Sequence, residues 1–515
     1  MLSYPTFTVQ VAPRIQAVLG LSVFSLFLLV IQTVLGEDVA TAAAFSGATF
    51  FGLLAVSEAG LLTAFGILNL FLVTRFLLVA YLMKNVLMGE PIGAHLQDPE
   101  STGLVMLLGF AGVFLGTTLV KGLVRPLPPF RRAPSAGALL ALTITLFCAG
   151  RATSVAILLS GGGGEGAISA TTTGGIWGIL KMFPSFSDLS IATALLYLWK
   201  TKSPQWMLHP MVLLLVAINF AFGIISTSKQ GMLEPLAVYM LMGFLRYRLS
   251  KPALPLLAAI AALTFQFFIA PVSQYVRGHG GRDVNAITAV STTIDVVSGY
   301  LTDGAFRQRV LDGDTTQLQN STTPSDYLTK NLALFSRFAM VAEADRLVAA
   351  TDCYRTYTGW QTIVDGLLLA VPHFLYPQKP QLGTNNFFGR YTEDLAEDDR
   401  TTQVSYGFFA NWYNAFGLAG VFVGTMATAS FLFLITGLVS TGAIHTSPWP
   451  LLTVMSMNHG YVEESMSGQI GVIHMPLMAL SAFLLAWFVE RWFFHNANAN
   501  TKIAGTSADT PAVHT

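Results

Sequence analysis

The stretch Ile15–Gly36, IQAVLGLSVFSLFLLVIQTVLG, contains 22 residues and no charged side chain. A run of about 20 apolar residues can cross the hydrocarbon core of a membrane as a helix, because a helix satisfies its own backbone hydrogen bonds. The apolar part of a cleaved signal peptide is shorter, about 7–15 residues. We therefore interpret Ile15–Gly36 as a membrane span. The small residues at Ala40–Ala44 keep a cleaved signal peptide as the alternative.

Comparable apolar runs recur along the whole chain of 515 residues, which is 53% hydrophobic and only 11% charged. Soluble domains carry about 25% charged residues. The sequence therefore predicts an all-α polytopic membrane protein with about twelve spans, within a range of about 10–14. The expected spans are 15–35, 40–57, 60–83, 101–120, 136–159, 182–199, 206–226, 233–249, 252–271, 412–437, 447–460 and 469–490.

These spans divide the chain into four parts. Residues 1–271 form an N-terminal bundle of about nine helices, and residues 272–411 form a large external loop with amphipathic helices. Residues 412–492 contribute about three further helices, and 493–515 is expected to be a disordered tail. Because long loops inside compact proteins usually carry function, the external loop is the first place to look for a site.

Lysines and arginines in short loops decide which side of the membrane a loop faces. With the N-terminus inside, the cytoplasmic loops hold nine such residues: Lys121, Arg125, Arg131, Arg132, Lys200, Lys202, Arg246, Arg248 and Lys251. The short loops of the other side hold three: Lys84, Lys181 and Lys229. This imbalance predicts cytoplasmic N- and C-termini and places 272–411 outside.

The composition also excludes several classes of function. The net charge of zero gives no bulk attraction to nucleic acid, so no nucleic-acid partner is expected. Cys148 lies in an apolar run and Cys353 in a polar region, so we do not expect them to pair, and no spacing suggests a zinc site. Asp312-x-Asp314 lies in a polar turn, LDGDTTQ, which we interpret as solvated. We therefore expect neither a metal nor another cofactor.

The segment SQYVRGHGGRD, Ser273–Asp283, brings charge suddenly to the end of a span. Arg277, His279, Arg282 and Asp283 follow a stretch of uncharged residues and stand among glycines that allow a tight turn. Arginines at a helix end often extend to lipid headgroups, which is the structural explanation. The functional explanation is that these cations bind an anionic ligand at the outer membrane surface.

Two later segments carry a family pattern: VPHFLYPQKPQLGTNNFFGRY at Val371–Tyr391, and GFFANWYNAFGLAGVFVG at Gly407–Gly424. They resemble the bacterial oligosaccharide repeat-unit polymerases, also called O-antigen polymerases. The matching positions are Pro372, Pro377, Lys379, Pro380, Tyr413, Phe416, Gly417 and Gly420. Earlier in the chain Ser226 and Ser228 match a Ser-x-Ser-Arg step, in which Lys229 keeps only the positive charge. The departures are His373 and Lys229 where the family has arginine, Tyr376 where it has tryptophan, and Asn411 where it has an acidic residue.

The resemblance implies a fold like that of multi-span lipid-sugar glycosyltransferases in the bacterial inner membrane. The implied substrate is a polyprenyl-diphosphate-linked oligosaccharide, and a chain-length regulator is the expected protein partner. Fixed arginine and histidine donors would stabilise the diphosphate leaving group without a metal. Arg355 and Gly366 also fit the family's Arg-x10-Gly spacing, which chance alone produces about once in this loop.

The residues assigned to these roles fall into two sets. The catalytic candidates are Arg277, His279, Arg282 and Arg355. The substrate-binding candidates are Lys229, Asp283, His373, Lys379, Arg390 and Glu464. Trp360, Tyr376 and Trp412 could stack on sugar rings, although packing or a place in the interfacial aromatic belt is the favoured explanation of each.

Two other functions stay open. A transporter or flippase for lipid-linked sugars would have polar residues near the bilayer midplane and, often, internal repeats. A non-catalytic subunit of a polysaccharide assembly complex would tolerate the loss of its arginines.

Overall fold

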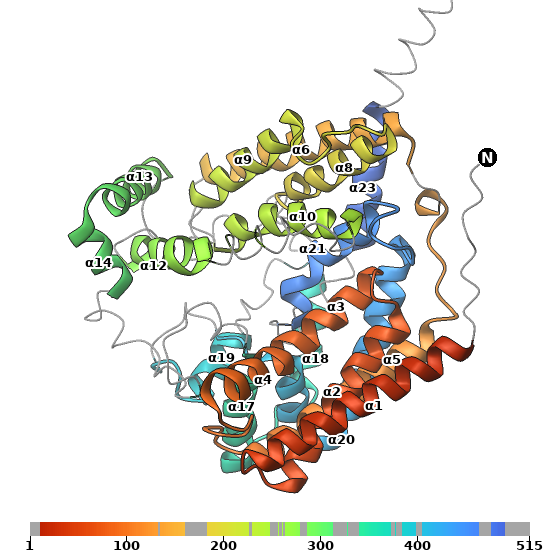
Figure 1. Cartoon of the computed structure of the whole chain (residues 1–515), viewed down its shortest axis with the longest axis vertical. Coiled ribbons are helices and arrows are strands. Elements are labelled where there is room, and N and C mark those ends of the chain that lie inside the picture. Colours follow the sequence, from red (N-terminus) through yellow and green to blue (C-terminus); the bar gives the residue numbers. More distant parts are fainter. Residues whose placement is uncertain are drawn as a thin grey trace, which may run out of the picture.

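The computed structural model describes residues 11–131, 134–159, 183–225, 229–247, 256, 260, 263–278, 286–312, 327, 339–371, 376, 384–397, 404–462 and 475–489. Within these ranges all regular secondary structure is helical, with one isolated β-bridge between Thr63 and Ala443. The predicted all-α class is confirmed for this part of the chain. Helices α1–α5 and α17–α20 gather in one group in Figure 1, and α6, α8, α9 and α10 form a second group with α23 beside it. Helix α21 lies between the two groups.

The first half of the chain supplies the helices of both groups. They are α1 (Val11–Val34), α2 (Val39–Ala59), α3 (Ala64–Val73), η1 (Thr74–Leu78), α4 (Val79–Tyr81), η2 (Leu82–Met88), α5 (Pro99–Val120), η3 (Pro128–Phe130), α6 (Ala136–Leu159), α8 (Phe186–Lys200), α9 (Pro210–Ile225) and α10 (Lys229–Tyr247).

The second half alternates short helices with one long one. They are η5 (Phe265–Ile269), α12 (Ala270–Gly278), α13 (Ala286–Thr302), α14 (Gly304–Asp312), α17 (Met340–Tyr354), α18 (Gln361–Ala370), α19 (Thr384–Tyr391), α20 (Gly407–Val439), α21 (Trp449–Val462) and α23 (Met475–Val489).

Six helical segments of the described chain are long and apolar enough to cross a membrane, against the twelve expected from sequence. They are Gln16–Val34, Val39–Ala59, Ala64–Met88, Pro99–Val120, Ala136–Ile157 and Gly407–Val439. Shorter apolar helices cover three more expected spans, at Pro210–Ile224, Gly231–Leu245 and Pro476–Val489. The helices α8 and α21, of 15 and 14 residues, correspond to the two expected spans that contain Asp188 or two prolines.

Two boundaries differ from the sequence expectation. The third span continues to Met88 instead of ending near 83, because the helix passes through two π-helical segments, η1 and η2, without stopping. The long helix α20 begins at Gly407, five residues before the expected start of its span.

Exposed apolar side chains show why the bundle belongs in a membrane. On α1, Val23, Leu26 and Val34 are each more than half exposed, and within the described residues the helix packs mainly against α2. In water such a surface would be a large apolar patch of the kind that soluble monomers avoid. A helix that is apolar around most of its circumference instead suits contact with lipid.

Glycines allow α5 to pack closely between α2 and α20. A Cβ at Gly112 would stand 2.6 Å from the carbonyl oxygen of Phe422, and one at Gly116 would stand 2.5 Å from that of Met426. Small residues four apart allow this close backbone approach in membrane helices. Thr425 strengthens the contact, since its hydroxyl donates to the Gly109 carbonyl at 3.1 Å.

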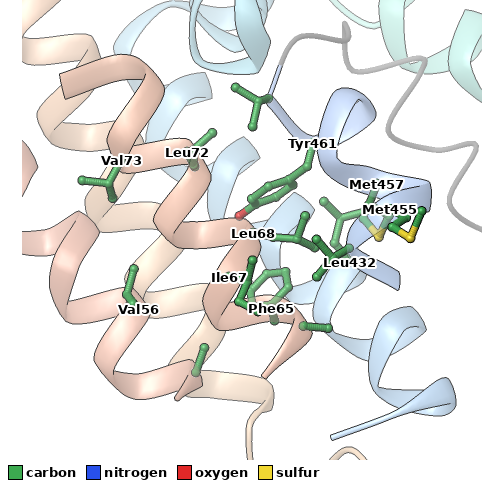
Figure 2. Close-up of a cluster of buried hydrophobic side chains, with 14 of the residues drawn as sticks. Val56, Phe65, Ile67, Leu68, Leu72, Val73, Leu432, Met455, Met457 and Tyr461 are labelled. Atoms are coloured by element: carbon green, nitrogen blue, oxygen red, sulfur yellow. The ribbon is translucent and has the colours of Figure 1, made fainter. Parts of the chain in front are cut away.

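Helix α3 contributes several buried side chains to the larger core. Figure 2 shows Phe65, Leu68 and Leu72 of α3 beside side chains of α20 and α21. The Tyr461 hydroxyl of α21 is buried here and donates to the Asn69 side chain at 2.7 Å, so the polar group has a partner.

Hydrogen bonds tie loops together at one end of the first group, called here the α17 end. The Gly93 amide donates to Glu37 at 2.7 Å. The buried Asp345 of α17 accepts from the Gln97 and Asp98 amides at 2.6 and 3.0 Å and from the Thr102 hydroxyl at 2.9 Å. Part of the expected external loop is therefore fixed to the segment between η2 and α5.

The opposite end has its own contacts. The Lys121 ammonium lies 3.1 Å from Glu58, and the Ile444 amide donates to the Leu62 carbonyl at 2.9 Å. In the second helix group, the Lys200 ammonium donates to the Pro134 carbonyl at 2.5 Å. Each contact joins segments that an alternating order of spans puts on the same side of a membrane.

Candidate functional site

The structure describes two of the ten predicted site residues with their side chains, Arg355 and Arg390. Arg277 and Lys229 are described only as backbone, in α12 and at the start of α10. The others lie outside the described residues: His279, Arg282, Asp283, His373, Lys379 and Glu464.

The elements that carry Arg277 and Arg355 have different neighbours. Helix α12 packs mainly on η5, α13 and α14, around the small cluster of Val272, Val276 and Tyr300. Helix α17, which ends just before Arg355, packs on α20, α5 and η1. Of the two arginines, only Arg355 lies at the α17 end, where the described residues make enough contacts to define a candidate site.

Helix α20 is broken next to this site, inside the family-like motif Tyr-x-x-Phe-Gly, which is Tyr413–Gly417 in this chain. Phe416 (φ −145°, ψ 17°) and Gly417 (φ 66°, ψ −159°) leave the helical conformation. The Gly417 torsions belong to a region that only glycine occupies readily. The motif glycine thus permits a break that another residue would resist.

The break leaves helix carbonyls without their usual partners, and the segment after α17 supplies replacements. The Thr358 amide donates to the Asn414 carbonyl at 3.1 Å, and the Gly359 amide donates to the Ala415 carbonyl at 3.2 Å. The buried Asn414 side chain donates to the Thr351 hydroxyl at 2.9 Å and accepts from that of Thr358 at 3.0 Å. These bonds fix the position of the 355–360 segment on the opened helix.

Two aromatic residues of the motif region hold the first part of α20 in place. The Tyr413 hydroxyl donates to Asp352 of α17 at 2.5 Å. Trp412 is buried, and a Cβ at Gly424 would stand only 2.2 Å from its ring. Its indole nitrogen donates to Thr428 at 3.2 Å. Trp412 therefore packs inside the protein and is not available to stack on a sugar, in agreement with the packing interpretation.

Arg355 and a set of exposed aromatic side chains lie next to the broken part of α20. We call the set the aromatic face: Tyr354, Tyr357, Trp360 and Phe387. Trp360 is 71% exposed and Tyr357 is 52% exposed. The Trp360 ring contacts the Phe416 ring edge-on, with centroids 5.2 Å apart. Arg355 is itself exposed and has a left-handed backbone, with φ 49°.

A carboxylate borders the aromatic face. The Tyr354 hydroxyl donates to Glu393 at 2.7 Å, and this hydrogen bond raises the pKa of Tyr354. Glu393 also has a left-handed backbone, with φ 62°. Two of the non-glycine residues with positive φ, Arg355 and Glu393, are thus connected through Tyr354. Such strained conformations are enriched at functional sites.

Arg390 lies on α19, next to Tyr391, whose ring contacts that of Tyr354 with centroids 5.4 Å apart. The Nε atom of Arg390 is buried and makes no hydrogen bond. The structure therefore brings Arg390 and Arg355 to the same α17–α19 junction. The predicted substrate-binding role of Arg390 stays a prediction.

An ionic network beneath the junction fixes α17 to the chain before α20. The Arg346 guanidinium pairs with Asp394, and the Tyr406 hydroxyl donates to the other oxygen of that carboxylate at 2.6 Å. Burial, together with the nearby Asp394 charge, raises the pKa of Tyr406. The phenol therefore stays protonated and keeps its role as a donor.

Within the described residues, no group of three or more His, Cys, Asp or Glu side chains could hold a metal ion. Cys148 and Cys353 are both free, as expected from their positions, and both are exposed.

The arrangement combines a cation, exposed aromatic rings and a carboxylate at one end of an apolar bundle. Such a surface can bind a ligand that has both anionic groups and apolar ring faces. Sequence reasoning named Arg355 and Trp360 but missed Tyr354, Tyr357 and Glu393. The run YRTYTGW at 354–360, with three aromatic residues in seven, was the available signal.

Comparison with protein-family models, with curated proteins and with solved structures finds no match to this chain.

Proposed function

We propose that the protein is a glycan polymerase of the bacterial inner membrane. It would join lipid-diphosphate-linked oligosaccharide repeat units into a surface polysaccharide on the outer face of that membrane. The hydroxyl of one lipid-linked unit attacks the sugar that is attached to the lipid diphosphate of another, and the polyprenyl diphosphate leaves.

The observation that carries the proposal is the break of α20 at Phe416 and Gly417. The Tyr-x-x-Phe-Gly motif suggested the polymerase family from sequence, and its glycine is the residue that permits the break. The carbonyls opened by the break hold the segment with Arg355, Tyr357 and Trp360. The family-like motif and the candidate site therefore depend on one another physically.

Arg355 suits a diphosphate leaving group because a guanidinium stays charged and can donate two parallel hydrogen bonds to phosphate oxygens. Arg277, His279 and Arg282 would supply further donors, with no metal required. The acceptor hydroxyl needs a proton acceptor, for which His279, Asp283, His373 and the pair Glu463–Glu464 are the candidates. The exposed rings of the aromatic face would bind the sugar faces.

The finer topology is part of the proposal. Twelve spans, cytoplasmic termini and an external 272–411 segment would bring the α17 end to the outer membrane surface. The charge imbalance between loops supports this orientation. The contact of Asp345 with the segment before α5 supports a shared side for these two regions.

The test is the length distribution of polysaccharide in cells whose own gene is replaced by a variant. We expect Arg355→Ala, Arg277→Ala and Arg282→Ala each to remove long chains while single repeat units still accumulate on the lipid carrier. Loss of one such donor typically lowers a rate by about 10²–10³. Arg131→Ala is the control, because Arg131 is exposed after η3, in the same loop as Lys121 and away from the α17 end. Unchanged chain lengths in all three variants, at normal protein levels, would refute the proposal.

A second candidate function is transport or flipping of the lipid-linked sugar. A polar cluster inside the second helix group favours it: Arg151, Asp188, Asn219 and Glu234 stand on apolar helices. Charged residues within membrane helices often mark transport pathways. The same assay separates the two functions, since a flippase defect removes short and long chains together.

A further inference from the structure

The turn after α19 brings a carboxylate to the α17 end. Glu393 lies two residues after α19, and its backbone is left-handed, with φ 62°. Glycine and asparagine adopt this conformation readily, whereas a long side chain such as glutamate does so at a cost. Glu393 is also exposed, so burial of its side chain does not offset that cost. The presence of a carboxylate here therefore needs another explanation.

Hydrogen bonds on both sides of Glu393 fix this turn. The Glu393 amide donates to the Arg390 carbonyl at 3.2 Å. The next residue, Asp394, is buried and accepts hydrogen bonds from the Arg346 guanidinium and the Tyr406 hydroxyl. Because these bonds fix the backbone from which the Glu393 side chain extends, the carboxylate has a defined position.

Only one oxygen of this carboxylate is used within the protein. Oε1 of Glu393 accepts from the Tyr354 hydroxyl at 2.7 Å. Among the described residues, Oε2 accepts no hydrogen bond and Glu393 forms no ion pair, so Oε2 keeps its capacity to accept from a ligand. A hydrogen bond between exposed groups competes with water and adds little stability. Holding Tyr354 therefore does not account for the strained glutamate by itself.

The groups around the carboxylate suit a sugar that carries an attacking hydroxyl. Arg355 follows Tyr354 directly, so the guanidinium proposed for the diphosphate and the phenol bound to Glu393 belong to the same end of α17. The Tyr391 hydroxyl donates to the Thr356 carbonyl at 3.3 Å, which joins α19 to the segment just after Arg355. The Tyr354 ring is about half exposed. A sugar can stack its apolar face on such a ring while a hydroxyl donates to the adjacent carboxylate.

We propose that Glu393 is the proton acceptor for the attacking hydroxyl, an inference that rests on the proposed polymerase function. The hydroxyl of the acceptor unit gives its proton to Oε2 of Glu393 while its oxygen forms a bond to the anomeric carbon of the donor unit. The bond from that carbon to the diphosphate breaks, and its electron pair leaves with the diphosphate, which Arg355 stabilises. The candidates named above for this proton all lie outside the described residues, whereas Glu393 lies at the same end of α17 as Arg355.

The experiment measures chain formation by the full-length protein in lipid nanodiscs, supplied with lipid-linked repeat units extracted from cells that lack the gene. We expect Glu393→Gln to lower kcat by about 10²–10⁴, because an amide cannot take up the proton, and to change KM by less than about threefold. The amide oxygen still accepts from Tyr354, so the contact with α17 remains. Glu393→Asp keeps a carboxylate and should restore kcat at least about tenfold over Glu393→Gln. Glu397→Gln, the same change at an exposed position four residues later, is the matched control and should behave like the wild type.

Two further variants separate a catalytic from a structural role. Glu393→Gly removes the carboxylate and relieves the left-handed backbone, so we expect loss of kcat with an unfolding midpoint within about 2 °C of the wild type. This variant decides the question if Glu393→Gln folds poorly. Tyr354→Phe removes the hydrogen bond but keeps the ring and the carboxylate, and should lower kcat by less than about tenfold. If Glu393 only ties α19 to α17, Tyr354→Phe loses more activity than Glu393→Gln, and the inference is wrong.

The inference and the proposed function fail in different ways. If Arg355→Ala abolishes chain formation while Glu393→Gln and Glu393→Gly stay within about threefold of the Glu397→Gln control, Glu393 is not the proton acceptor and the polymerase function stands. If the wild type joins no repeat units, the proposed function fails and this inference fails with it.

Discussion

The Glu343 carboxylate lies near Arg346, whose guanidinium pairs more closely with Asp394. Its Oε2 atom is buried without a hydrogen bond and lies 3.6 Å from the Arg346 guanidinium. Arg346 itself pairs closely with Asp394. Burial raises the pKa of the Glu343 carboxyl, Arg346 acts in the opposite direction, and the Asp394 charge raises it further. Ionised Glu343 is therefore a cost to the fold, whereas Asp394 carries the ion pair.

This gives a prediction on pH dependence. A carboxyl whose pKa is higher in the folded than in the unfolded protein contributes stability below its unfolded pKa of about 4.3. That contribution is lost as the pH rises through the folded pKa. Glu343→Gln cannot ionise, so we expect its unfolding midpoint to exceed that of the wild type at pH 8 and the difference to shrink towards pH 4.

The measurement is thermal unfolding in nanodiscs across that pH range. Glu397→Gln is the control, because Glu397 is exposed in the turn after α19. A Glu343→Gln midpoint below that of the wild type at pH 8 would mean that the attraction to Arg346 outweighs the cost of burial.

At the residue scale, the sequence predicts candidates better than it predicts their surroundings. Arg355 and Trp360 could be named because charge and aromatic rings in an external loop are visible in the chain. The partners of Arg346, by contrast, depend on Asp394 and Tyr406, which are 48 and 60 positions away. No local pattern records such contacts, since packing of α17 against the chain before α20 creates them.

Among the elements, α20 shows both the strength and the limit of hydropathy. The run after Gly407 is apolar enough to predict a span, and the structure has a helix there. Hydropathy does not record the break at Phe416 and Gly417, because both residues are apolar. The signal for the break was a glycine within a motif, which sequence reasoning used only as a family mark.

The break gives a prediction for Gly417→Ala. The Gly417 torsions, φ 66° and ψ −159°, are essentially restricted to glycine. A Cβ would meet no close atom, since the nearest, on Tyr357, is 3.9 Å away. The cost is therefore backbone strain alone, and we expect a loss of about 1–3 kcal/mol of stability or a straighter α20.

Either outcome would disturb the segment that holds Arg355, so long-chain polysaccharide should also decrease. Unfolding midpoint and chain length are measured on the same variant. Gly122→Ala is the matched control, with open space around its Cα and an ordinary φ. If Gly417→Ala and Gly122→Ala have the same midpoint, the strain argument fails.

Across the whole molecule, the contacts at the two ends of the bundle decide which loops share a side. Asp345 ties α17 to the segment before α5, and Lys121 and Glu58 meet at the other end. Sequence charge predicts which end is cytoplasmic, because Lys121 belongs to a loop rich in positive residues. The alternation of spans could be predicted from hydropathy. The tertiary contacts at each end could not, because they join residues that are far apart in the sequence.

The orientation can be measured with the two natural cysteines. Cys353 is exposed near the end of α17, and Cys148 is exposed on α6, within an apolar span where a charged reagent does not enter. In a Cys148→Ser background, we expect a membrane-impermeant maleimide to label Cys353 from the outside of cells whose inner membrane is intact. A cysteine introduced by Leu123→Cys into the chain without natural cysteines tests the other side, since Leu123 is exposed next to Lys121. That site should be labelled only after the inner membrane is permeabilised.

Because Cys353 is exposed, failure to label it cannot be attributed to burial. The reverse pattern of labelling would place the α17 end, with Arg355 and the aromatic face, in the cytoplasm. There a lipid-linked oligosaccharide that has crossed the membrane cannot reach it, so this single reversal would remove polymerisation on the outer face as a function.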